Sequence, residues 1–137
     1  SFDKRDAMES QLDLTKALCM AIYKGTGLVV KSGFLSPVNQ LGIVEDPGSS
    51  STTDMAGLST WKYNFSITLK TADRTMAATQ LQKISDFLHS LRSLESPNGS
   101  FLFKTIDISS APSESMEDLK GNITYALAFT VTVLRRR

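Results

Sequence analysis

Few side chains in this sequence belong to the types that perform catalysis or bind metal ions. The chain has one histidine, His89, and one cysteine, Cys19, and Asp86 precedes His89 by three residues, a spacing that makes them neighbours on a helix. A zinc site needs three or four nitrogen or sulfur ligands. No Gly-x-Ser-x-Gly motif is present to hold a nucleophilic serine, although a Ser–His–Asp triad assembles from distant positions and composition alone does not exclude one. The sequence therefore favours a protein that is not an enzyme and uses no metal or cofactor.

Two short motifs resemble binding loops but lack the full patterns. Gly25-Thr26-Gly27 resembles part of a phosphate loop, yet it follows a predicted helix and lacks the Gly-x-Gly-x-x-Gly spacing. We interpret it as a helix stop that Gly25 closes, followed by a turn. Glu114, Glu117 and Asp118 lack the alternate spacing and central glycine of a calcium loop. They are interpreted as part of a solvated loop.

Size and composition indicate one domain, residues 1–137, with a core of its own. At 137 residues, 41% of them hydrophobic, the chain is long enough to bury about two-thirds of its unfolded surface. Its net charge of +1 provides no global field toward nucleic acid or anionic membrane. A lone cysteine is typical of the reducing cytosol. The apolar run Ala17–Tyr23 is far shorter than the ~20 residues of a membrane span.

The strongest structural signal is the strict alternation of Thr60–Lys70, in which every second residue is apolar. That period predicts a strand with one face on a core and one face in water. A helical stripe follows, capped by Asp73 or Thr71 and ended by Pro97-Asn98-Gly99. We expect Phe101–Ile108 to be a central strand because apolar residues occur on both of its faces. The expected order is helix Asp3–Lys24, strands Leu28–Lys31, Leu41–Glu45 and Thr60–Lys70, helix Asp73–Leu94, and strands Phe101–Ile108 and Asn122–Leu134.

This order, α-β-β-β-α-β-β, predicts an α+β fold with two helices and a mostly antiparallel sheet of four to five strands. Two polar segments, Asp46–Ser59 and Ser109–Gly121, are expected to be long loops, because they contain turn formers and hydroxyls and little to bury.

The last predicted strand has two unlike faces. One face carries large apolar residues, whereas the other carries Thr124, Ala126, Ala128 and Thr130. An exposed strand face usually carries charged side chains. Small and hydroxylated side chains let another protein layer approach closely, so this face is either a tolerated surface or a contact between subunits.

The order of elements, with the strings Trp61–Ile67 and Gly121–Val131, resembles the tail terminator proteins of long-tailed bacteriophages, also known as minor capsid or tail completion proteins. The resemblance implies two helices packed on one face of the sheet, and no catalytic residues. It implies a homohexameric ring that caps the tail tube and joins it to the head or neck. The implied partners are further copies of the chain, the tail tube protein and the head–tail connector. The implied location is the tail–neck junction of a virion assembled in bacterial cytoplasm.

The resemblance also suggests which residues make contacts, since the polar loops of the family reach toward tube or neck subunits. The triple arginine at the C-terminal end matches no feature of the family. It is either a solubilising end or a contact with acidic tube subunits or with DNA passing through the lumen. The candidate contact residues are Asp46, Ser50, Thr53, Asp54, Glu114, Glu117, Asp118, Thr124, Ala126, Ala128, Thr130, Arg135, Arg136 and Arg137.

Two other functions fit the same pattern of residues. The first is a small ligand-binding α+β module in which the aromatic face of Trp61–Leu69 lines a cavity. The second is a monomeric neck or tail-completion protein, which shares the fold and differs in stoichiometry.

Overall fold

The computed structural model describes residues 4–32, 38–53, 58–94, 101–109, 113–115 and 117–136. In these ranges the chain forms two helices and six strands. They are α1 (Lys4–Thr26), β1 (Val30–Ser32), β2 (Leu41–Thr53), β3 (Leu58–Thr71), α2 (Arg74–Ser90), β4 (Leu102–Ile108), β5 (Ser113–Glu114) and β6 (Ile123–Arg136).

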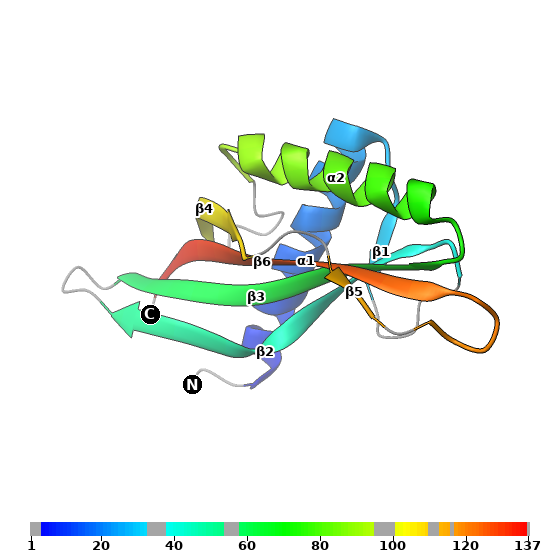
Figure 1. Cartoon of the computed structure of the whole chain (residues 1–137). Coiled ribbons are helices and arrows are strands. Elements are labelled where there is room, and N and C mark those ends of the chain that lie inside the picture. Colours follow the sequence, from blue (N-terminus) through cyan, green and yellow to red (C-terminus); the bar gives the residue numbers. More distant parts are fainter. Residues whose placement is uncertain are drawn as a thin grey trace.

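The strands form one mostly antiparallel sheet in the order β1-β2-β3-β6-β4, with the short β5 also paired to β6. Only the β1–β2 pair is parallel among the described strands. Figure 1 shows α1 crossing behind the strands and α2 lying above them, near the end of α1. The α+β prediction is thereby confirmed, with β5 as a strand beyond the expected five.

The two longest strands pair without interruption. β3 and β6 are antiparallel in register from Leu58 opposite Arg136 to Thr71 opposite Ile123. Because side chains alternate along a strand, this register puts the large residues of both strands on one face. Phe65 lies directly opposite Phe129, and their rings stack with centroids 5.7 Å apart. The alternation predicted for both strands is confirmed.

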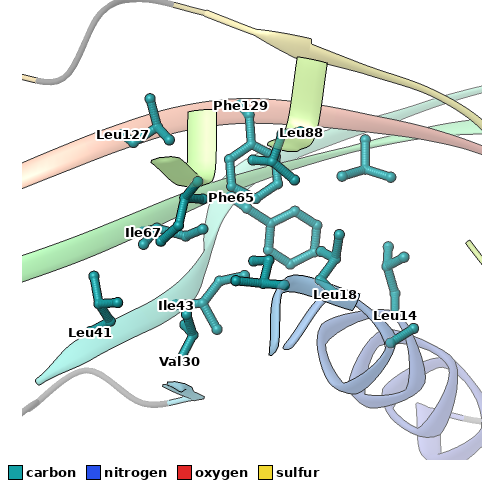
Figure 2. Close-up of a cluster of buried hydrophobic side chains, with 14 of the residues drawn as sticks. Leu14, Leu18, Val30, Leu41, Ile43, Phe65, Ile67, Leu88, Leu127 and Phe129 are labelled. Atoms are coloured by element: carbon teal, nitrogen blue, oxygen red, sulfur yellow. The ribbon is translucent and has the colours of Figure 1, made fainter. Parts of the chain in front are cut away.

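Both helices pack on that face and complete the core. Leu14 and Leu18 of α1 and Leu88 of α2 converge on the Phe65–Phe129 pair (Figure 2), and all five are at most 2% exposed. Burying a side chain of this size contributes about 1.5–3 kcal/mol. Both helices are therefore attached to the sheet by one shared apolar core between them and the strands.

The end of α1 differs from the sequence-based expectation. The helix continues through Gly25 to Thr26, and Gly27, with φ of 77°, is the residue in the left-handed region. The Gly27 N–H donates to the Tyr23 carbonyl at 2.8 Å, which is the bond of a glycine helix ending. Gly25 has another reason to lack a side chain, because a Cβ there would overlap the Phe87 ring of α2.

The cap of α2 agrees with one of the two expected candidates. Asp73 is the N-cap, and its carboxylate accepts a hydrogen bond from the Met76 N–H at 2.9 Å. Helix α2 ends at Ser90, four residues before the expected Leu94, yet Leu94 is still buried in the core. The predicted stop, residues 97–99, lies outside the described residues.

The prediction of a long loop over Asp46–Ser59 is wrong for most of its length. β2 continues to Thr53 and β3 begins at Leu58, so the two form a long hairpin arm. The sequence did not indicate this part of β2 because it carries hydroxyl side chains instead of alternating apolar ones. Threonine is nevertheless common in strands. A register shift between Asp46 and Ser50 accommodates Pro47 and Gly48.

The second polar segment, Ser109–Gly121, is also not simply a loop. It contains β5, whose Ser113 and Glu114 pair with Ala126 and Tyr125 of β6. A two-residue strand has too short a pattern to be seen in a sequence.

The expected central position of Phe101–Ile108 is wrong, since β4 lies at the end of the sheet order. The apolar residues on both faces come from a bulge between Phe103 and Thr105, which resets the alternation. Phe103 and Ile106 therefore both pack against the core, whereas Leu102 is 64% exposed.

Replacement of Gly25 by alanine tests the contact between the helices. Alanine normally stabilises a helix by about 1 kcal/mol relative to glycine. Here we expect Gly25→Ala to destabilise the fold by about 1–3 kcal/mol, because the methyl group overlaps the Phe87 ring. Urea denaturation of Gly25→Ala, Phe87→Ala and the double variant measures this. In the Phe87→Ala background, Gly25→Ala should be neutral or stabilising; equal effects in both backgrounds would contradict the proposed overlap.

Candidate interaction surfaces

The residues that first suggested chemistry are not assembled into a reactive site in the described part of the chain. His89 is exposed near the end of α2, and Asp86 accepts a hydrogen bond from Gln82 at 2.9 Å. Among the described residues, no three side chains of the metal-ligating types gather into a group. None of the described helices combines the length and apolar character that crossing a membrane requires.

Cys19 is half-buried and packs against the core. Burial raises the pKa of its thiol, which keeps the sulfur in the less nucleophilic protonated form. This is the environment of a small hydrophobic residue.

The face of the sheet opposite the helices carries small side chains and is not covered by any described element. We call this surface the open face. At its centre Ser66 and Thr68 of β3 lie opposite Ala128 and Ala126 of β6, and Gly42 of β2 lies beside Thr68. The candidates Thr124, Ala126, Ala128 and Thr130 therefore lie together on one surface.

Cross-strand hydrogen bonds fix the polar side chains of the open face. The Thr130 hydroxyl donates to the Asn64 side-chain oxygen at 2.9 Å, and the Ser66 hydroxyl donates to the Asp46 carboxylate. Because these groups are paired within the sheet, their side chains are held in place. Asp46 thus joins the candidates from β6, whereas Asn64 and Ser66 were missed. The alternation of Thr60–Lys70 contained the signal for them, since it placed both on the polar face.

At least one of the C-terminal arginines, Arg135, is held against the sheet by other side chains. β6 extends to Arg136, and the Arg135 guanidinium stacks over the Trp61 ring, 5.2 Å from its centroid. It also donates to the Tyr63 hydroxyl at 2.7 Å. Trp61 in turn stacks on Tyr63 at 5.9 Å. Arg135 is therefore anchored on the helix side of the sheet, while Arg137 lies outside the described residues.

Burial is the largest cause of the pKa shifts of two side chains in this sheet, Tyr63 and Glu45. Burial raises the pKa of the Tyr63 hydroxyl, and the hydrogen bond and charge of Arg135 act against that rise. Burial also raises the pKa of Glu45, with the neighbouring Asp46 charge adding to the effect.

At the other end of the sheet, Asp118 organises a tight turn. Its carboxylate accepts hydrogen bonds from the Lys120 and Asn122 N–H groups at 2.8 and 2.9 Å, and the Lys70 ammonium lies 3.2 Å away. The hydrogen bond from Asn122 is the largest cause that lowers the pKa of Asp118 to about 2. Asp118 thus has a structural role in addition to any contact it makes.

Glu114 lies apart from the other acidic candidates. It pairs with Tyr125 and so faces the helix side, where it borders a cavity of about 240 Å³ beneath α2. Of the remaining candidates, Glu117 is exposed, the side chains of Ser50, Thr53 and Arg136 lie outside the described part, and so does the whole of Asp54.

The comparisons with known proteins give a likeness to solved structures. No protein-family model matches the chain, and no curated protein sequence matches it. Among solved structures, the chain is similar to one from a structure of the virion of a native gene transfer agent particle. The TM-score is 0.55 at 14% identity, over 85% of this chain and 84% of that chain. At this identity the likeness shows a shared fold.

The Asp118 turn predicts a specific acid sensitivity. The carboxyl group has a pKa of about 2 in the folded chain against a reference value of 3.8, so its contribution to stability is fully present above pH 3.8 and is lost as pH falls toward 2. Urea unfolding from pH 7 to pH 2 should show the wild type losing more stability than Asp118→Asn below pH 4. Parallel curves for the two proteins would contradict this assignment.

Removal of the Arg135 side chain should destabilise the end of the β3–β6 pair that carries Trp61 and Arg135. We expect Arg135→Ala to cost about 1 kcal/mol, because it loses the cation–π contact with Trp61 and the hydrogen bond to Tyr63. Fluorescence of the single tryptophan reports unfolding and the local change together. Arg135→Lys is the matched control for charge and should recover only part of the loss. A full recovery by lysine would contradict a role for the planar guanidinium.

Proposed function

We propose that this protein is a structural component of a phage-like virion, a tail terminator that forms a ring, caps the tail tube and joins it to the head or neck. The observation that carries the proposal is the fold shared with a chain of a gene transfer agent virion over 85% of this chain. The order of elements and the aromatic strings of the sequence support the same family.

The surfaces of the molecule are those of an assembly protein. The centre of the open face is built mostly of short side chains, and two cross-strand hydrogen bonds, Ser66–Asp46 and Thr130–Asn64, hold polar groups in place there. Such a face loses little side-chain entropy when another protein covers it, because short side chains have few rotamers to lose. We propose that a neighbouring virion protein, the tail tube or the neck, docks on the open face.

The two polar segments lie at opposite ends of the sheet, as Figure 1 shows for the β2–β3 hairpin arm and the turn before β6. The arm ends beside Arg135 and the other end carries the Asp118 turn. We propose that the arm and the turn make further contacts above and below a ring.

The alternative of an aromatic ligand cavity receives less support. Tyr63, Phe65, Ile67 and Leu69 are all at most 3% exposed and pack against the helices, and Trp61 is covered by Arg135. The aromatic row of β3 thus contributes to the core itself.

Mass measurement and tube binding together test the proposed function. Size-exclusion chromatography with light scattering should find a closed ring of about six subunits, and the ring should co-sediment with tail tubes. Ala128→Lys puts a long charged side chain at the centre of the open face, and we expect tube binding to fall at least about tenfold because the buried charge would be unpaired. Thr79→Lys, on the exposed side of α2, is the matched control and should bind as the wild type does. Equal binding by Ala128→Lys would exclude the open face, and a wild type that binds no tube would overturn the function.

A further inference from the structure

The cavity beneath α2 contains a buried hydroxyl with no hydrogen-bond partner. Tyr125 is 5% exposed, and its hydroxyl is the one buried side-chain polar atom of the described residues without a partner. The walls are apolar, formed by Ala77, Ala78 and Leu81, and the rim is polar. A buried hydroxyl without a partner costs free energy, and the side chain that carries this one is among those that line a cavity with room for a ligand.

The size of the cavity suits an aromatic ring. Its volume is about 240 Å³, whereas an apolar cavity of about 150 Å³ already binds benzene. A fitting group would combine a flat apolar body with a hydrogen-bonding tip that reaches Tyr125. A tyrosine side chain has this composition, with an apolar ring and a hydroxyl that both donates and accepts.

The opposite edge of the sheet presents such a side chain. Tyr23, near the end of α1, is 57% exposed and stands with Met20 and Val29, which are 46% and 53% exposed. These residues border a shallow apolar groove beside β1. We call them the Tyr23 knob. It stands next to β1, which is one end of the strand order. The cavity stands next to β5, which pairs with β6 on the side away from β3.

The rim of the cavity carries one acidic and one basic side chain, Glu114 and Arg74, both exposed. Lys24 follows Tyr23 and is also exposed. Docking the knob in the cavity brings this positive group of one subunit toward a rim that carries both charges on the next.

We infer that Tyr23 of one subunit inserts beneath α2 of a second copy and hydrogen-bonds to its Tyr125. This head-to-tail contact uses two different surfaces, and its repetition closes a ring when the rotation between neighbours divides a full turn evenly. It rests on the proposed ring-forming function and names the contact that forms the ring. Contacts between edges leave the open face of every subunit equivalent and free for the docking partner.

Complementation between two defective variants tests this contact. Tyr23→Ala lacks the knob but keeps the cavity, whereas Ala78→Trp fills the cavity but keeps the knob. Sedimentation velocity should show each variant alone as a monomer. Their equimolar mixture should form dimers and no larger species, since only one intact contact per pair remains. Rings from either variant alone, or a mixture that stays monomeric, would overturn the inference, as would a wild type that is monomeric at every concentration.

Tyr125→Phe separates assembly from folding. Because the hydroxyl has no partner within the chain, its removal should leave the unfolding midpoint of the monomer equal or higher. The same change should weaken ring formation at least about fivefold, since the bond to Tyr23 is lost. Unchanged assembly would contradict the hydrogen bond, and a large loss of monomer stability would show that the hydroxyl is structural.

Cross-linking locates the contact directly. In a Cys19→Ser background, a Met20→Cys copy and a Gln82→Cys copy should form a disulfide-linked heterodimer on mild oxidation, and Tyr23→Ala should abolish it. Lys83→Cys, about 100° around α2, is the matched control and should give at least about fivefold less product. Rings that form without the 20–82 product would overturn this contact while leaving the proposed function intact. Efficient cross-linking by a ring that binds no tail tube would overturn the function and leave the contact.

Discussion

The unbroken pairing of β3 with β6 is the constraint on which the rest of the structure depends. Fourteen residues of each strand face one another without a bulge. Because the side-chain period is two, a slip by one residue would turn the Phe65 row toward solvent and the small residues toward the helices. The stacked Phe65 and Phe129 rings therefore form the centre of the core and also oppose any change of register.

Irregularities are confined to the strands that flank this pair. The register shifts occur between Asp46 and Ser50 of β2 and between Phe103 and Thr105 of β4. An outer strand that bends can follow the twist of the sheet without disturbing the central pair. The result is a rigid two-strand centre with helices on one face, an open second face, and edges made partly of very short strands.

Short edge strands offer few backbone groups for pairing with another chain. β1 has three residues and β5 has two, so association at these edges depends mainly on side chains. This agrees with a knob of exposed apolar residues at one edge and a cavity at the other. The proposed docking on the open face is a different contact, in which short side chains have little entropy to lose.

The sequence by itself determined the elements whose pattern is long and regular. The period of two in Thr60–Lys70 and Asn122–Leu134, and the helical stripes, were sufficient to predict the α+β class and the two faces of the last strand. The ends of the elements were harder to predict from the sequence. Gly25 was expected to close α1, but it lacks a side chain because Phe87, which is distant in the sequence, packs against it.

Only the tertiary structure decided which segments lie side by side. The place of β4 at the edge, the hairpin arm within Asp46–Ser59, the Arg135–Trp61 stack and the cavity at Tyr125 all depend on pairing between residues far apart in the chain. Periodicity reports the environment of each residue along one element, namely which side is buried. It carries no information on the partner that buries it, since any apolar surface of suitable shape satisfies the same pattern.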